Sequence, residues 1–279
     1  MASSLTTQPP PTPTYLLTYP SPYVLLITIN RPRAMNSLPY TSHWEADALL
    51  LWFDSEPTLR IAIITGGGTP NKAFCAGQDL IEQRDLADLR SRIAAGDQTA
   101  RKAMPDRRTL THPPSGFMGV SRRAGKKPIF LGCDIIVASP NATFGLPEAM
   151  RGLYAGAGGL SRLVRLAGMT VASEIAMAGR FLSAQEAVQY GIANRVSKTH
   201  ESCVPEAVEI ASRIAGLSPD AIIVTRHGLR QSWETASVER ASQETEMRYG
   251  ALLRDGENIG IGLRAFAEKK QAVWVPSKL

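Results

Sequence analysis

The chain has 279 residues, of which 44% are hydrophobic, and its 31 Lys and Arg against 25 Asp and Glu give a formal net charge of +6. This length fits one globular domain with a substantial core. No apolar run approaches the ~20 residues that a membrane span requires, which excludes a membrane-spanning protein. The three cysteines are scattered along the chain and argue against a disulfide framework or a thiolate zinc site. The basic residues are spread along the chain without interleaved aromatic residues, which argues against nucleic-acid binding and leaves open a small ligand with several phosphates.

The first half of the chain is predicted to contain short buried strands. Residues 1–14 are rich in Pro, Thr and Ser and are expected to form a disordered leader. Apolar β-branched runs then predict strands over 24–29, 60–65 and 134–138, each ended by a turn that contains Pro or Gly. Because these strands alternate with helical patterns, we expect an α/β fold with sheets buried on both faces.

Helices are predicted most clearly in the second half. Ser183-Ala-Gln-Glu186 has the pattern of a capping box, and the helix that it opens is expected to end at Gly191. Further helices are predicted over 234–253 and 262–270, the first with a charged, solvated face.

The last three residues, Ser277, Lys278 and Leu279, form the sequence S-K-L at the end of the chain. This tripeptide is an address that the peroxisomal import receptor reads. We therefore expect a peroxisomal location and that receptor as a partner, with a chance tripeptide as the alternative.

Two segments combine unusual backbone chemistry with reactive side chains. In residues 63–80, a buried strand and a glycine turn lead into Cys75-Ala-Gly77 and a helix, where free amides would face a developing negative charge. In residues 141–159, Glu148 lies among apolar residues and glycines, which would desolvate the carboxylate, raise its pKa and suit it to proton transfer. The alternatives are an ordinary strand-turn-helix connection and a glutamate that complements a helix dipole.

Other chemistries receive no support from the sequence. Neither a Rossmann nor a P-loop fingerprint is present, and no G-x-S-x-G elbow indicates a serine hydrolase. The four histidines lack the spacing of metal ligands. We therefore expect no metal site.

Several motifs, taken in order, closely resemble the crotonase family of enoyl-CoA hydratases and isomerases. They are Ile27-Thr-Ile-Asn-Arg-Pro-Arg-Ala-Met-Asn-Ser-Leu38, Ala73-Phe-Cys-Ala-Gly-Gln-Asp-Leu80, Cys133-Asp-Ile-Ile-Val-Ala-Ser139, Phe144-Gly-Leu-Pro-Glu148, Gly179-Arg-Phe-Leu-Ser-Ala-Gln-Glu-Ala187 and Phe266-Ala-Glu-Lys-Lys270. The resemblance covers nearly everything from Val24 onward. It implies an α/β fold, with a crotonase-like spiral of βαβ units over residues 15–200 and a helical part over 201–276 that drives assembly into a homotrimer or hexamer.

The resemblance also implies roles for individual residues. Glu148 would be the catalytic acid/base, and the backbone N–H of Ala76 would bind the thioester oxygen and stabilise the enolate. The residues implied to bind the acyl-CoA substrate are Arg33 and Ala34 near the CoA nucleotide, and Ala76, Gly77, Gln78 and Asp79 around the thioester. No separate cofactor is implied, because CoA is part of the substrate.

The chain departs from the family pattern after Ile129. At this point family members carry a strand and a second glycine-rich turn that supplies the other oxyanion N–H, and hydratases also carry a second glutamate there. In this chain Phe130 connects the segment that ends at Ile129 directly to the segment that begins at Leu131. About fifteen residues are missing, the length of a strand and a helical turn or two, and the loss of one oxyanion donor lowers a rate by about 10²–10³.

This departure leaves several hypotheses open. The leading one is a peroxisomal enoyl-CoA hydratase/isomerase that the loss impairs and tilts slightly toward isomerisation. A non-catalytic subunit that binds acyl-CoA or co-assembles with a full-length homologue is the alternative. An alternative or mispredicted splice is a third.

Overall fold

The structure is a computed structural model that describes residues 5–68, 73–106, 110–120, 125–130, 134–235 and 237–279. Its helices and strands, in chain order, are β1 (Tyr15–Ser21), β2 (Val24–Ile29), η2 (Pro32–Ala34), α1 (Tyr40–Ser55), β3 (Ile61–Gly66), α2 (Leu80–Ala94), α3 (Gln98–Ala103), η4 (Phe117–Gly119), β4 (Ile129–Phe130), β5 (Val137–Ala138), β6 (Thr143–Phe144), η5 (Pro147–Arg151), α4 (Gly159–Ala178), β7 (Leu182–Ser183), α5 (Ala184–Gln189), β8 (Arg195–Val196), α6 (Cys203–Ala215), α7 (Pro219–Thr235), α8 (Val238–Thr245), η6 (Glu246–Gly250), α9 (Ala251–Arg254) and α10 (Glu257–Ala267). Over these ranges, none of the helices combines the length and the apolar character that crossing a bilayer requires.

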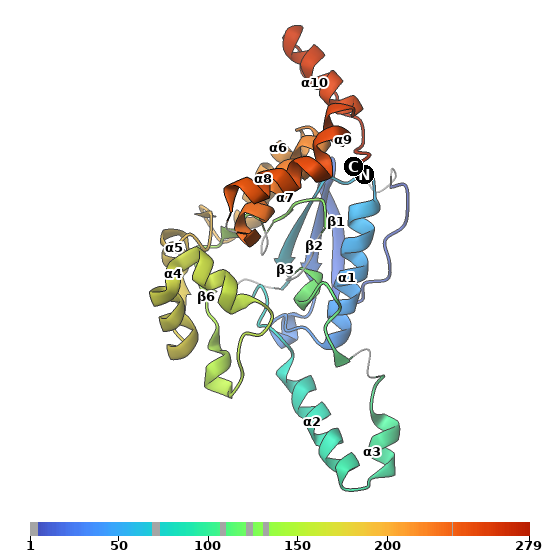
Figure 1. Ribbon diagram of the computed structural model, residues 1–279. Helices are drawn as coiled ribbons and strands as arrows, with labels where there is room; N and C mark the ends of the chain where they lie inside the picture. The colour runs from blue at the N-terminus through green and yellow to red at the C-terminus, as the bar shows by residue number, and fades with distance from the viewer. Residues whose placement is uncertain (1–4, 69–72, 107–109, 121–124, 131–133, 236) are drawn as a thin grey trace.

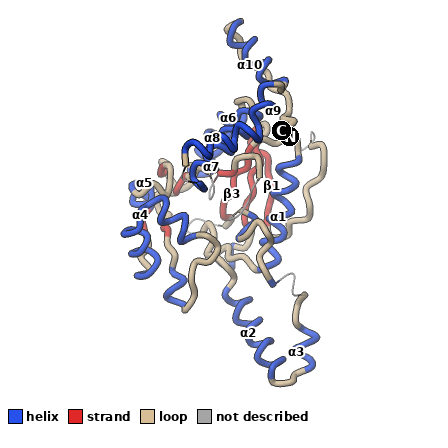
Figure 2. The backbone as a smooth tube through the Cα atoms, viewed as in Figure 1, coloured by secondary structure: helices blue, strands red, loops and turns tan. Residues whose placement is uncertain are grey.

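The main sheet has the strand order β1-β2-β3-β4 (Figures 1 and 2). Strand β1 pairs with β2 in antiparallel fashion, and β2 pairs with β3 in parallel along the whole of both strands, from Val24 opposite Ile61 to Ile29 opposite Gly66. On its other side β3 pairs with β4 only at Ala62 and Ile63. The parallel part of the sheet is therefore complete on one side of β3 and short on the other.

Helices bury both faces of this sheet because the apolar residues of the strands point alternately to either side. On one side Leu25, Ile27 and Ile29 pack with α1, whose Phe53 is fully buried. On the other side Val24, Ile61 and Ile63 pack with Ala207, Ile210 and Ala211 of α6. These continuous apolar runs place the core at β2 and β3, as the sequence pattern predicts.

Two small sheets, β5 with β8 and β6 with β7, join the middle of the chain to α4 and α5. The predicted helix from Ser183 is confirmed, since Ser183 and Glu186 form a complete capping box. Gly191 follows the end of α5 with a φ of +71°. A helix break of this kind requires the left-handed backbone that glycine adopts without strain.

The predicted strand over 134–138 is reduced to Val137 and Ala138. Just before β5 the pairing involves a side chain, because Ile136 N–H donates to Asn194 Oδ1 at 2.7 Å while Asn194 N–H donates to the carbonyl oxygen of Ile136 at 2.9 Å. The predicted helix over 234–253 is likewise divided among the end of α7, α8, η6 and α9, and the last predicted helix begins earlier, at Glu257, and ends at Ala267.

The N-terminal segment makes hydrogen bonds to the body of the protein. Thr6 and Thr7 N–H donate to the carboxylate of Glu56 at 3.1 and 2.9 Å, and Thr14 N–H donates to Glu45. Although burial alone raises the pKa of Glu56, hydrogen bonds from these threonines and Thr58 lower it to about 2. Residues 5–14, expected to belong to a disordered leader, therefore lie along α1, from Glu56 after its end to Glu45 near its start.

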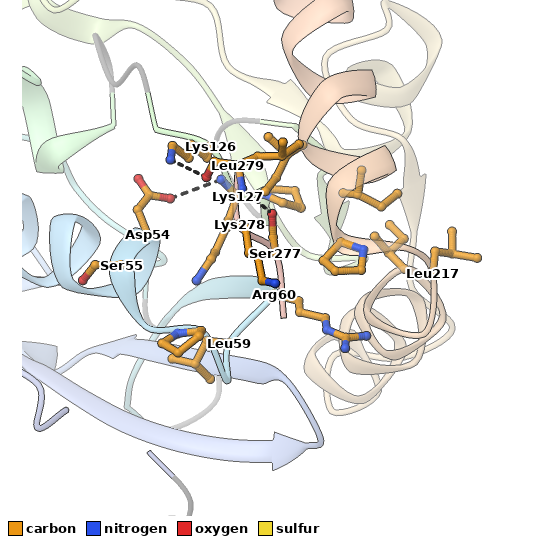
Figure 3. A pocket seen from close by; sticks show the side chains of 16 residues that line it. Asp54, Ser55, Leu59, Arg60, Lys126, Lys127, Leu217, Ser277, Lys278 and Leu279 are labelled. Carbon is orange, nitrogen blue, oxygen red and sulfur yellow. Dashed lines mark hydrogen bonds between the residues drawn. The ribbon is translucent and has the colours of Figure 1, made fainter. Parts of the chain in front are cut away.

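The C-terminal tail folds back onto the body of the protein, where its last three residues lie beside Lys126 and Lys127 (Figures 1 and 3). The side chain of Asn258, which is 1% exposed, accepts from Val275 N–H at 3.1 Å and donates to the carbonyl oxygen of Val275 at 3.2 Å. Lys126 Nζ donates to the carbonyl oxygen of Leu279 at 2.5 Å. The tripeptide 277–279 thus lines a pocket between the end of α1 and the start of α7.

Two helical segments project from the body, α2 with α3 at one end and α10 at the other (Figure 1). Leu86 is the buried residue of α2, and Asn258 is that of α10. The far part of α10 exposes large apolar side chains, with Leu263 65% and Phe266 86% exposed. The apolar side chains at the far end of α10 are therefore not covered by other parts of the described chain.

Candidate active site

The turn Cys75–Asp79 lies between β3 and α2 and is fixed by backbone hydrogen bonds to Leu38. Leu38 N–H donates to the carbonyl oxygen of Gly77 at 2.9 Å, and Asp79 N–H donates to that of Leu38 at 3.0 Å. Gly77 has a φ of +94°, which L side chains rarely adopt. This pairing brings the turn directly beside the segment that follows β2.

Asn36 joins the two segments from a fully buried position. Its Oδ1 accepts from Arg31 N–H at 2.9 Å, while its Nδ2 donates to the carbonyl oxygens of Gly67 and Ala73 at 2.9 and 2.7 Å. The φ of Asn36 is +56°, in the left-handed region that asparagine tolerates better than most residues. Asn36 was not among the predicted site residues, although an Asn after a Pro-containing turn is a signal for such a conformation.

Replacement of Asn36 by Ala is expected to lower the free energy of unfolding by about 2 kcal/mol, because three partly buried backbone groups lose their hydrogen bond to its side chain. Urea denaturation of the variant and the wild type measures this difference. Asn141→Ala, at an exposed position, is the matched control and should leave the stability unchanged within about 0.5 kcal/mol. Equal stability of Asn36→Ala and the wild type would contradict this role.

Asp79, predicted to bind substrate, caps a helix in the structure. Its Oδ1 accepts from the N–H groups of Ile81 and Glu82 at 3.1 and 3.3 Å, and its Oδ2 lies 2.9 Å from Arg31 Nη1. Although burial alone raises the pKa of Asp79, the Arg31 guanidinium and these N–H donors lower it overall. The carboxylate therefore holds the turn in place and is occupied by the protein's own donors.

Gln78 also points into the protein. Its Oε1 lies 2.9 Å from His43 Nε2 and 3.1 Å from His112 Nε2. Met118 N–H donates to Nδ1 of His43 at 2.9 Å, so the proton of the neutral ring is on Nε2 and is donated to Gln78. Sequence reasoning missed this histidine cluster, since the three side chains are separated along the chain and are brought together only by folding.

His43 is fully buried, and burial lowers its pKa to about 4, with neighbouring His112 acting in the same direction and the hydrogen bond to Gln78 opposing it. In the unfolded chain His43 takes up a proton near pH 6.5. Between these two pH values the unfolded state binds more protons, so the contribution of His43 to stability is complete above pH 6.5 and is lost as the pH falls toward 4.

We therefore expect the free energy of unfolding to fall by about 2 kcal/mol between pH 6.5 and 4.5 through His43 alone. Urea denaturation across this range measures the slope. His227, whose pKa is lowered mainly by burial, adds to the slope in the wild type, so the comparison that isolates His43 is with His43→Gln. His200→Asn serves as control and should keep the full slope, whereas an unchanged slope in His43→Gln would contradict the assignment.

Ala76 is exposed at the surface of the turn, but its backbone N–H is engaged. It donates to the carbonyl oxygen of Met35 at 3.1 Å. Arg33 and Ala34 form η2 immediately before Met35, with Arg33 exposed and Ala34 half-buried. The structure thus brings the predicted nucleotide-binding turn and the predicted thioester-binding turn side by side. The N–H of Ala76, the predicted oxyanion donor, forms the hydrogen bond that links the two turns.

Glu148 lies in the first turn of η5, directly after Pro147. Phe144 and Leu146, just before it, pack into the apolar cluster with Leu163 and Leu182. The Oε2 atom of Glu148 is buried, and no hydrogen-bond donor within the described residues reaches it. A buried carboxylate oxygen without a partner is costly for a fold and is characteristic of a functional group that awaits a ligand or a proton.

The structure does not join Glu148 to the turn at Ala76. Over the described ranges no hydrogen bond connects η5 with residues 75–79. The four predicted substrate-binding residues of the turn are brought together with Arg33 and Ala34, and Glu148 makes no direct hydrogen bond to them, as expected if a substrate lies between.

The junction after β4 is short. Asp134 N–H donates to the carbonyl oxygen of Ile129 at 3.2 Å, and Asp134 Oδ2 accepts from Ile129 N–H and Arg226 Nε, both at 2.9 Å. The three intervening residues, which include Cys133 of the predicted family motif, lie outside the described part of the chain. Three residues are too few for a strand and a glycine-rich turn.

The sequence of the chain matches a known protein family over most of its length. A sequence model of the enoyl-CoA hydratase/isomerase family matches residues 21–276. The chain belongs to the enoyl-CoA hydratase/isomerase family. Members of this family act on CoA thioesters, so the resemblance to crotonases and the predicted enzyme class are confirmed.

Relatives in this family are similar over nearly the full length. The chain is 42% identical to mevalonyl-coenzyme A hydratase of Aspergillus fumigatus, over 95% of this chain and 96% of the relative. It is 40% identical to mevalonyl-coenzyme A hydratase of Beauveria bassiana, over 99% and 100%, and 33% identical to 2,3-dehydroadipyl-CoA hydratase of Escherichia coli, over 88% and 93%.

A solved structure supports the predicted fold. An enoyl-CoA hydratase from Mycobacterium tuberculosis superposes with a TM-score of 0.76 at 28% identity, over 95% of this chain and 100% of the other. The crotonase-like α/β fold of this enoyl-CoA hydratase/isomerase family member is therefore confirmed.

The alignment with the Beauveria bassiana relative is longer than this chain. It spans 291 positions, whereas the chain of this enoyl-CoA hydratase/isomerase family member has 279 residues. Some residues of that hydratase therefore have no counterpart in this chain.

Proposed function

We propose that this family member is a hydratase for a short, branched β-hydroxyacyl thioester of the chemistry of mevalonyl-CoA. Two relatives that are at least 40% identical over nearly their whole length carry mevalonyl-coenzyme A hydratase as their name. The observation that carries the proposal within the structure is the buried, unpartnered Oε2 atom of Glu148.

The proposed reaction adds water across the C2–C3 double bond of a 2-enoyl thioester. Glu148 takes a proton from the incoming water as its hydroxyl bonds to C3, and delivers a proton to C2, so that the carboxylate returns to its starting state. The N–H of Ala76 stabilises negative charge on the thioester oxygen. For this purpose the thioester oxygen must replace the carbonyl oxygen of Met35, which accepts from Ala76 in the structure.

Arg33 and Ala34 are proposed to lie against the CoA nucleotide. Their turn is adjacent to Ala76 through the Met35 hydrogen bond, which suits a ligand whose thioester and nucleotide ends both lie on this edge of the sheet. The proposal is tested by incubating the purified chain with the 2-enoyl thioester and following formation of the 3-hydroxy product. Turnover of other 2-enoyl thioesters but not of this one would overturn the substrate assignment.

A second candidate function is a non-catalytic subunit. The engaged N–H of Ala76 and the alignment gap favour it, since the oxyanion hole would then lack one donor and hold the other in an internal bond. Acyl-CoA binding without turnover, or assembly with a full-length homologue, distinguishes it from the hydratase.

We further propose assembly into a trimer or hexamer and import into the peroxisome. The exposed apolar side chains of α10, such as Leu263 and Phe266, supply a surface that a second copy would cover, and sedimentation equilibrium measures the oligomer. The tripeptide 277–279 supports import. Imaging of the chain with a fluorescent protein at its N-terminus, with and without the tripeptide, tests the location.

A further inference from the structure

A strongly basic cavity lies between α4, α7 and η6. Its volume is about 740 Å³, within the range of small-molecule sites. The residues with cationic side chains that line it are Lys126, Arg162, Arg165, Arg226, Arg230 and Arg248. Glu234 is the one carboxylate among its described lining residues.

The guanidinium groups come from three separate elements that converge on this space. Arg162 and Arg165 lie one turn apart in α4, Arg226 and Arg230 one turn apart in α7, and Arg248 in η6. Like charges held together in this way repel one another, and an anion that enters the cavity relieves the repulsion. The excess of cationic side chains around the cavity therefore favours the entry of an anion.

The floor of the cavity is fixed. Arg226, with 9% of its side chain exposed, donates through Nε to Asp134 Oδ2 at 2.9 Å and through Nη1 to the carbonyl oxygen of Gly125. Arg230 Nε lies 3.7 Å from the other oxygen of the same carboxylate. One carboxylate therefore faces two guanidinium groups.

The rim of the cavity combines exposed cations with an aromatic ring. The guanidinium of Arg165 lies 5.6 Å from the ring centre of Trp233, and both Arg165 and Arg248 are exposed. Planar guanidinium groups bind phosphate oxygens in pairs, with two N–H donors each. Several such groups around one space suit an anion with more than one phosphate group.

We propose that this cavity binds a soluble anion that carries two or more linked phosphate groups. None of the residues proposed for thioester or nucleotide binding lines the cavity. The lining includes Gly156 and Gly158 of the loop that follows Glu148, but the proposal concerns a second ligand and does not depend on the proposed reaction.

The test is a calorimetric titration of the full chain with inorganic pyrophosphate, and in parallel with orthophosphate. We expect saturable binding of one pyrophosphate per chain and weaker binding of orthophosphate. The double variant Arg165→Ala/Arg248→Ala removes two exposed guanidinium groups of the rim and is expected to weaken pyrophosphate binding by about tenfold or more. Arg226 is left intact, because its pair with Asp134 belongs to the fold.

Two controls separate a specific site from general attraction. Arg240→Ala/Arg264→Ala removes the same charge from exposed positions outside the cavity and should leave the affinity unchanged, as should Arg33→Ala. The proposal is overturned if pyrophosphate does not bind, if orthophosphate binds equally well, if both double variants weaken binding equally, or if only Arg33→Ala weakens it.

Discussion

Replacement of Glu148 by Gln is expected to reduce turnover of the 2-enoyl thioester by about 10²- to 10⁴-fold. The amide has the shape of the carboxylate but neither takes up nor delivers the proton that hydration requires. Because Oε2 has no partner in the described structure, the substitution breaks no hydrogen bond at that atom. We therefore expect the variant to remain folded, with its circular dichroism unchanged.

The matched control is Glu174→Gln, which removes a carboxylate that pairs with Arg180 at an exposed position of α4. This variant should retain full turnover. Unchanged turnover in Glu148→Gln would show that Glu148 only complements the first turn of η5, and the proposed reaction would then lose its acid/base. A product measurement from single turnovers with excess enzyme gives the required sensitivity.

Restoring the missing segment is expected to raise turnover by about 10²- to 10³-fold. The change inserts, between Phe130 and Leu131, the residues of the Beauveria bassiana relative that have no counterpart in this chain. The insertion would supply the second oxyanion donor and extend β4 beyond its present two residues. Turnover of the inserted chain and of the chain as it stands is compared on the same thioester.

A Gly-Ser segment of equal length at the same position is the control for this insertion and should give no gain. Equal turnover of both inserted chains would show that the second donor does not limit the rate. If the chain as it stands binds acyl-CoA without turnover while the inserted chain is active, the non-catalytic subunit is the correct description of the present sequence. Glu148→Gln in the inserted chain then tests the acid/base directly.

The sequence correctly predicted the helices and strands that are stabilised by contacts within a few residues or whose apolar side chains are fully buried. The strand over 24–29 was predicted within its observed bounds because an apolar run between polar turns leaves few other conformations. The helix at Ser183 was predicted from its cap, which acts within one turn. The strand over 134–138 was predicted too long, since Asn194 and Arg226 compete for its polar groups and no local pattern reveals them.

The candidate site was predictable in its residues but not in its hydrogen bonds. The family motif located Gln78 and Asp79, yet the structure shows both side chains turned toward internal partners, His43 and Arg31. The N–H of Ala76 was assigned to substrate, and only the fold shows that Met35 accepts from it. These hydrogen bonds join segments that are far apart in the sequence and meet only in the fold. A sequence motif therefore identifies the residue but not its hydrogen-bond partner.

The short pairing of β3 with β4 also bears on how the chain behaves at high concentration. Along β3, Ile64 to Gly66 have a strand neighbour on the β2 side, whereas within the described residues β4 covers only Ala62 and Ile63 on the other. An uncovered strand edge with an apolar sequence is a template for pairing with the edge of another molecule. Ile64 is only 2% exposed in the folded chain, so this edge becomes available to another molecule when the fold opens locally, and intermolecular β-pairing should begin from partly unfolded chains.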